Sequence, residues 1–142
     1  MKKIIISILI AYVLDVTLRE YLAASKAKRI AKKLGKPLLN VGSGTKGSSL
    51  TGAKLRGDVN CDLAVPVGVR CGEGAICHCD VQNLQFKDKQ FGVVLIANVM
   101  QYVPDKKKAM AELHRVADEV IIVDNWIPWM QLGPGPKFKF TA

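Results

Sequence analysis

The sequence is poor in aromatic residues, which form 6% of its 142 residues and are not interleaved with the lysines and arginines. Grooves that bind nucleic acid usually combine basic side chains with aromatic rings on which bases stack. We therefore expect no nucleic-acid partner. The chain also lacks an internal repeat with a period of roughly 20–50 residues, which argues against a solenoid or a propeller.

Cysteine is limited to four residues, Cys61, Cys71, Cys77 and Cys79. At 49% apolar residues, the chain is more apolar than small secreted domains that depend on disulfides, so we predict reduced cysteines and a cytoplasmic protein. One residue separates Cys77 from Cys79, whereas zinc sites usually have about two to four between paired cysteines. We predict buried thiols and no metal ion.

What the sequence does contain is a basic arm followed by a nearly neutral body. The formal net charge is +9, and residues 1–36 hold nine basic and two acidic residues against twelve and ten in the remainder. A basic arm of this kind fits nucleic acid or an anionic membrane surface. Since the first is not expected, we predict a membrane surface as a partner of residues 1–36.

The arm begins with an apolar segment that is short for a membrane span. Residues 4–14 carry no charge and would form a helix about 17 Å long, against about 30 Å for a hydrocarbon core. Extension to residue 24 adds Asp15, Arg19 and Glu20, which are costly in a bilayer.

Three interpretations of this segment stay open: a cleaved secretory signal, an uncleaved or interfacial anchor, or a helix packed in the core or on a partner chain. We predict an apolar helix over residues 1–24 that anchors to a membrane or partner, followed by a binding domain over residues 25–142.

The body shows apolar strands alternating with helices, which indicates a parallel α/β sheet. We expect helices at 25–34 and 105–116, strands at 38–41, 58–63, 74–79, 91–98 and 119–124, and a tail with an edge strand at 137–140. The predicted fold is a minimal Rossmann-like domain of strand order 3-2-1-4-5, with an N-terminal apolar helix and a truncated C-terminus. An uncovered sheet edge favours a homo-oligomer.

A glycine-rich loop follows the first predicted strand. Residues 42–47 match G-x-G-x-x-G, and Asp62 comes 18 residues after Gly44, at the end of the second strand. Such loops let a backbone approach a nucleotide while the acid binds ribose hydroxyls. Few residues separate the loop from the second strand, so a helix that would face a pyrophosphate hardly fits between them.

The ordered set of motifs resembles the class I S-adenosylmethionine-dependent methyltransferases, of the small methyltransferase type 11 kind. The stretches that carry the resemblance lie at 39–44, 57–63, 79–86, 91–103 and 112–116. The resemblance implies S-adenosylmethionine as cofactor. It implies cofactor-binding roles for Asn40, Gly42, Gly44, Asp62, Leu63, Asp80, Val81, Asn98 and Val99, with Asp62 on the ribose, Asp80 on the adenine, and Asn98 and Val99 near the methionine end.

The chain departs from this family at several positions. Asn40 stands where an acid is common, Gln101 and Tyr102 stand where Glu-His is common, and the usual Lys-Pro-Gly-Gly before the fifth strand is missing. If the reaction needs a base, Tyr102 and Asp124 are the catalytic candidates. Trp126 and Trp129 follow the fifth strand, where they would stack on a substrate, enter a membrane interface or pack in the fold.

The function expected from the resemblance is methyl transfer from S-adenosylmethionine to a small or lipid-like acceptor. An alternative is a non-catalytic accessory protein of the same fold, anchored to a membrane or partner. A third hypothesis, an NAD-dependent oxidoreductase, draws on the spacing of Tyr102 and Lys106, but Pro104 between them disfavours the helix that this pair needs.

Overall fold

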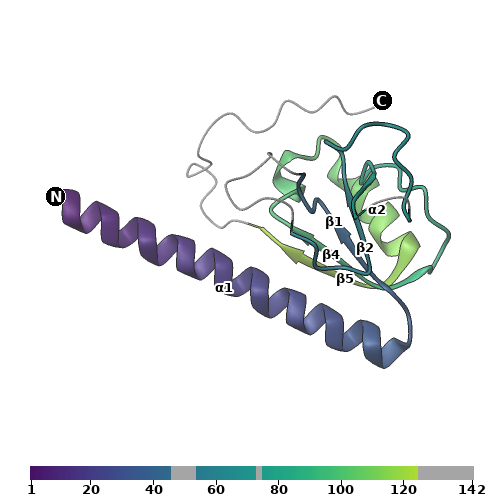
Figure 1. Ribbon diagram of the computed structural model, residues 1–142, viewed down its shortest axis with the longest axis horizontal. Coiled ribbons are helices and arrows are strands. Elements are labelled where there is room, and N and C mark those ends of the chain that lie inside the picture. The colour runs from purple at the N-terminus through teal and green to yellow at the C-terminus, as the bar shows by residue number, and fades with distance from the viewer. Residues whose placement is uncertain (46–53, 73–74, 125–142) are drawn as a thin grey trace.

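The computed structural model describes residues 1–45, 54–72 and 75–124. They form three layers, in which a five-stranded sheet carries one long helix on one face and one short helix on the other (Figure 1). The elements are α1 (Lys2–Leu34), β1 (Leu38–Val41), β2 (Val59–Asp62), β3 (Cys77–His78), β4 (Phe91–Ala97), the 3-10 helix η1 (Met100–Tyr102), α2 (Lys106–Val116) and β5 (Ala117–Val123).

The sheet confirms the predicted fold. Its strands are parallel and follow the order β3-β2-β1-β4-β5. The central strands β1 and β4 are the most apolar and are buried on both faces, as expected for strands covered by helices on each side. The strand predicted at 74–79 is shorter than expected, because β3 pairs with β2 over two residues only.

Helix α1 is one continuous helix of 33 residues, where the sequence predicted separate helices before and after residue 24. It ends at Gly35, whose φ of 64° is the left-handed conformation that glycine adopts readily. Its buried face is a stripe of small residues, Ala24, Ala27 and Ala31, spaced three and four apart. This stripe packs on Leu38, Val93 and Leu95 of the sheet.

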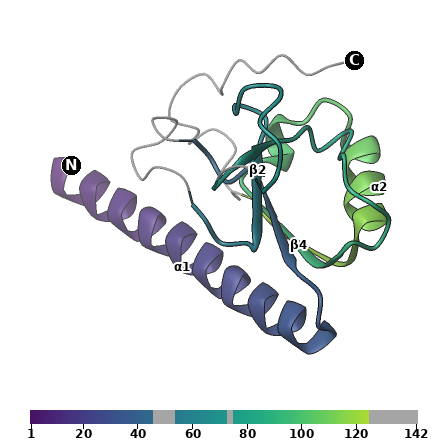
Figure 2. The ribbon, with the colours of Figure 1, turned by 45° about the vertical axis from the view of Figure 1, so that its right-hand side comes forward.

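The stripe on α1 runs antiparallel to the strands. Ala31 lies at the amino end of β4, where a Cβ on Gly92 would come within 3.5 Å of the Ala31 Cα. One turn before Ala24 the stripe ends in Glu20, which contacts Asn98 just beyond the carboxyl end of β4. The part of α1 before Glu20 therefore projects past the carboxyl edge of the sheet (Figure 2).

Residues 4–14 of this projecting part carry no charge. Large apolar residues are exposed at 4–6, 8–10, 13, 14 and 18, and at 21 and 22 just after Glu20. Within the described ranges, no helix is both long enough and apolar enough to cross a membrane. A separate anchoring role for residues 1–24 stays a prediction.

Helix α2 covers the opposite face with Ala109, Leu113 and Val116, which are fully buried against the core of the sheet. Its N-terminus is capped, since the Asp105 side chain accepts a hydrogen bond from the Lys108 N–H at 2.9 Å.

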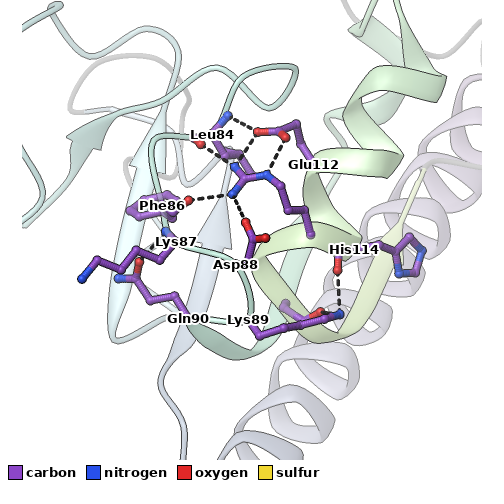
Figure 3. Close-up of polar contacts among 10 residues, drawn as sticks. Leu84, Phe86, Lys87, Asp88, Lys89, Gln90, Glu112 and His114 are labelled. Atoms are coloured by element: carbon purple, nitrogen blue, oxygen red, sulfur yellow. Dashed lines mark hydrogen bonds and ion pairs between the residues drawn. The ribbon is translucent and has the colours of Figure 1, made fainter.

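Arg115 connects the end of α2 to the segment that leads into β4. Its partners Leu84, Phe86, Asp88 and Glu112 are labelled in Figure 3. Its guanidinium donates to the carbonyls of Leu84 and Phe86 at 2.8 Å each, and to the carboxylates of Asp88 and Glu112. Glu112 also accepts the Leu84 N–H at 2.8 Å. The hydrogen bonds from Arg115 hold the pKa of the Glu112 carboxyl below its ordinary value. Two residues of the last matched motif therefore stabilise the fold.

The prediction of reduced cysteines is wrong for this structure. Disulfides join Cys61 to Cys79 and Cys71 to Cys77, with Cα separations of 5.5 and 4.7 Å. The physical reason is the sheet register, which places Cys61 directly beside Cys77 on neighbouring strands and so gathers all four sulfurs. The predicted edge strand at 137–140 and the two tryptophans lie outside the described residues.

Candidate functional site: the carboxyl edge of the sheet

The loop after β1 is held open by two left-handed glycines. Gly42 and Gly44 have φ angles of 73° and 78°. The N–H groups of Gly42 and Ser43 both donate to the carbonyl of Cys61 at the end of β2, at 2.8 and 3.2 Å. The first part of the predicted glycine motif is therefore a turn fixed against the neighbouring strand, while its positions 46 and 47 lie outside the described residues.

Gly42 has no room for a side chain. A Cβ at this position would lie 2.1 Å from Cγ2 of Val99, which follows β4. The glycine loop and the exit of β4, which the sequence predicted to share one site, are thus in direct contact.

Asp62 lies at the end of β2 and holds the glycine loop. It is buried, with 8% of its surface exposed. One carboxylate oxygen accepts the Gly44 N–H at 2.8 Å, and the other accepts the Ala64 N–H at 2.8 Å. Each oxygen keeps a lone pair for a further donor.

Asp80 follows the adjacent strand at the same edge. Asp62 is paired in register with His78, and the Cys79 N–H donates to the Asp62 carbonyl at 3.3 Å. Asp80 is buried, and its carboxylate accepts the Gln82 N–H at 2.8 Å. Val81 beside it is buried and Leu63 beside Asp62 is partly buried. The two carboxylates predicted from the sequence therefore lie on neighbouring strand ends.

Asn98 leaves β4 in a left-handed conformation, with a φ of 57°. Its side-chain amide donates to Glu20, and its Oδ1 is buried without a hydrogen-bond partner among the described residues. A buried acceptor without a donor costs free energy. Asn98 Oδ1 is thus an unused acceptor at the edge of the sheet, next to the residue that contacts the glycine loop.

Glu20 is the residue of this region that the sequence analysis missed. Its carboxylate is 3% exposed and accepts hydrogen bonds from Lys54 Nζ at 2.5 Å and from Arg56 at 2.6 Å, in addition to Asn98. Burial alone would raise the pKa of the Glu20 carboxyl, but the two cations outweigh it and lower the pKa. The sequence held one signal for this residue: Glu20 lies four residues before Ala24 and so continues the alanine stripe of α1.

Asn40, for which the resemblance implies a cofactor-binding role, has a side chain that hydrogen-bonds to β2 and to the segment before it. Its amide donates to the carbonyl of Lys54 at 2.7 Å and to Oδ1 of Asn60 at 3.1 Å. Because Lys54 also pairs with Glu20, Asn40 and Glu20 belong to one polar network behind the glycine loop.

The two catalytic candidates follow neighbouring strands at the same edge. Tyr102 is partly buried at the end of η1, just after β4, and Asp124 directly follows β5. Asp124 is exposed, yet desolvation raises the pKa of its carboxyl, and attraction from Lys106 opposes this in part. A raised pKa makes a carboxylate a better base near neutral pH.

A parallel α/β sheet with a glycine loop and paired carboxylates at its carboxyl edge is the arrangement of nucleotide-binding domains. A family model described as a methyltransferase domain, of type 11, matches residues 39–119. The match covers more than half of the chain, so the chain belongs to this family. It is therefore a methyltransferase domain of this type, and the resemblance to the family seen in the sequence is confirmed.

Among solved structures, the chain is similar to an S-adenosylmethionine-dependent methyltransferase from Thermotoga maritima, described as a possible histamine N-methyltransferase. The identity is 21% and the TM-score is 0.44; the match covers 77% of this chain and 56% of that one. The chain thus spans a little over half the length of this structure. No curated protein matches.

The residues present fit the adenosylmethionine group that the family implies. The buried Oδ1 of Asn98, which has no partner among the described residues, suits an ammonium donor, and the nearby loop carries no side chain at Gly42 or Gly44. Asp62 retains acceptor capacity for hydroxyl groups.

Proposed function

We propose that the domain binds S-adenosylmethionine across the carboxyl ends of β1, β2, β3 and β4 and transfers its methyl group to a small or lipid-like acceptor. The observation that carries the proposal is the placement of Asp62 and Asp80 at the ends of paired strands, with Asp62 bonded to the glycine loop. In this proposal Asp62 with Leu63 holds the ribose, Asp80 with Val81 holds the adenine, and Gly42, Gly44, Asn98 and Val99 surround the methionine end.

S-adenosylmethionine, when bound, supplies a methyl group that is already activated. The residues of this chain then need to orient the acceptor and exclude water, and a neutral nucleophile requires no single catalytic residue. For an acceptor that must lose a proton, Asp124 is the stronger candidate base because its pKa is raised. Tyr102 is the second candidate.

Isothermal titration calorimetry with S-adenosylhomocysteine tests the proposal without turnover. We expect binding by the full chain, a loss of at least about tenfold in affinity for Asp62→Ala and for Asp80→Ala, and no binding of NAD. The matched control is Asp88→Asn, which removes an exposed carboxylate from the segment just before the amino end of β4. Equal affinity in all three variants would contradict the assigned site.

A lipid-like acceptor is supported by the placement of the apolar part of α1. This part projects from the same edge of the sheet at which Asp62 and Asn98 lie (Figure 2). Exposed apolar helices with basic residues nearby bind to the surface of anionic membranes. The same observation supports the second candidate function, a membrane-anchored accessory protein without turnover.

Co-sedimentation with liposomes tests the membrane contact. We expect a variant with Ile5, Ile8 and Leu9 replaced by serine to lose binding, because these side chains are 63%, 60% and 40% exposed. Deleting residues 1–24 is a poorer test, since it also removes the buried Glu20 and Ala24. Unchanged sedimentation of the serine variant would contradict the contact. Methylation of extracted lipids, assayed in parallel, separates the enzyme from the accessory protein.

A further inference from the structure

A hollow lies at the opposite edge of the sheet from the proposed cofactor site. It has a volume of about 570 Å³ and lies between the end of α1, the turn into β1 and the segment before β2. Its lining includes Leu38, the first residue of β1, and Asp58, which directly precedes β2. The size is within the range of about 300–1,000 Å³ that small-molecule sites occupy.

The lining is strongly basic. It includes Lys28, Lys32, Lys36 and Arg56, against the single carboxylate of Asp58. That carboxylate accepts the N–H of Leu38 at 2.8 Å. The cavity therefore carries an excess of positive charge that its own acid does not neutralise.

Two of these cations have no partner in the described part of the chain. Lys36 pairs with Asp118 at 2.7 Å and Arg56 pairs with Glu20 at 2.6 Å. The side-chain ammonium groups of Lys28 and Lys32 form no hydrogen bond or ion pair within the described ranges. They lie four residues apart on α1, where like charges repel and destabilise a helix. An anion between them would remove this repulsion.

The carboxyl end of α1 presents partial negative charge, which opposes an anion. This opposition is weakened because the carbonyls of Ala31 and Lys32 accept the N–H groups of Lys36 and Gly35 at 3.3 and 3.2 Å. The remaining lining includes the apolar residues Ala31, Pro37, Leu38 and Leu55. The cavity thus combines two free ammonium groups with an apolar wall.

We propose that this cavity binds a phosphate-bearing anion, with Lys28 and Lys32 as the principal contacts and the apolar wall against its organic part. The site is separate from the cofactor edge and does not depend on the proposed methyl transfer. A soluble organic phosphate and the headgroup of an anionic phospholipid share this chemistry.

The test compares two double variants that remove the same charge from the same helix. Lys28→Ala with Lys32→Ala empties the cavity of its free cations. Lys26→Ala with Lys33→Ala removes two exposed lysines that do not line it. Alanine favours helix, so both variants should fold. Circular dichroism confirms this before binding is measured.

The probes are inorganic phosphate and glycerol 3-phosphate, followed by NMR shifts of the amides of Gly35, Leu38 and Gly57. Vesicles of phosphatidylcholine with and without phosphatidylglycerol form the lipid arm. We expect the cavity variant to bind at least about tenfold more weakly and the control to match the wild type.

The two arms identify the source of the anion. Shifts with the soluble phosphates support a soluble ligand, and a preference for phosphatidylglycerol vesicles that only the cavity variant loses supports a lipid headgroup. Equal weakening in both double variants would show a diffuse charge effect and overturn the proposal. So would the absence of binding to every probe.

Discussion

At the scale of single residues, Gly42 carries the strictest requirement. It combines a left-handed φ of 73° with an approach to Val99 that leaves no room for a Cβ. Gly35 has a similar φ of 64°, but a Cβ there would meet nothing within 4 Å. A substitution at Gly35 therefore measures the cost of backbone strain alone, whereas a substitution at Gly42 measures that strain together with a steric clash.

We predict that Gly42→Ala destabilises the fold by about 2–4 kcal/mol and Gly35→Ala by about 1 kcal/mol. Urea denaturation measures both. Adding Val99→Ala to Gly42→Ala should recover part of the loss, because it removes the contacting methyl groups and leaves only the strain of the backbone. Equal losses for the two glycines would show that the contact with Val99 is not formed.

Glu20 is the second residue with a specific requirement, since its buried charge is compensated only by its partners. We predict that Glu20→Gln destabilises the protein by about 2 kcal/mol, because Lys54 and Arg56 lose their counter-charge. The control is Asp15→Asn, which alters an exposed pair with Arg19 on the same helix and should cost well under 1 kcal/mol. Chemical denaturation compares the two variants. Similar losses would argue against the Glu20 network.

At the scale of elements, the acid stability of the fold depends on the contacts of α1 and α2. The pKa values of the Glu20 and Glu112 carboxyls are below the ordinary value of 4.5. A lowered pKa means that the folded state binds fewer protons than the unfolded state. The stabilisation is therefore complete above about pH 4.5 and is lost as the pH falls through the folded pKa.

We predict that Glu112→Gln flattens this acid dependence, because the titrating partner of Arg115 is gone. The urea concentration at the midpoint of unfolding, compared between neutral and acidic pH, measures this dependence. Glu119→Gln, an exposed change in β5, should leave the wild-type dependence intact. An unchanged acid slope in Glu112→Gln would contradict the role of the Arg115 contacts.

One disulfide joins β2 to the residue after β3, and the other joins β3 to the segment before it. Cys61 and Cys79 directly precede Asp62 and Asp80 and are 18 residues apart, whereas Cys71 and Cys77 are six apart. We predict a loss of about 3 kcal/mol for the alanine pair at 61 and 79, and about 2 kcal/mol for the pair at 71 and 77. Only the variant with alanine at positions 61 and 79 should also bind S-adenosylhomocysteine more weakly. Non-reducing mass spectrometry checks the bridges, and free thiols in the native protein would contradict them.

Much of the sheet could be predicted from sequence, because continuous apolar runs such as residues 91–97 identify strands buried on both faces. The glycine loop and Asp62 could be predicted because their spacing along the chain indicates neighbouring strand ends, whereas the role of Asp80 was implied by the resemblance to the methyltransferases. Glu20 could not, since its burial depends on Lys54 and Arg56, 34 and 36 residues away. The disulfides could not either, since they follow from a register that brings Cys61 beside Cys77.

At the scale of the whole molecule, α1 connects the two edges of the sheet. Its end borders the basic cavity, its alanine stripe crosses the face of the sheet, and Glu20 reaches Asn98 at the cofactor edge. Beyond that edge it projects as an exposed apolar helix. The proposed cofactor, membrane and anion sites therefore all border one element.

The central claim is that adenosylmethionine binds at the carboxyl edge, and an NMR titration of the full chain with S-adenosylhomocysteine tests it most directly. The account predicts saturable shifts in the amides of Gly42, Gly44, Asp62, Val81 and Asn98, with those of Gly35 and Gly57 unchanged. Shifts confined to the opposite edge, or none at saturating ligand, would contradict it.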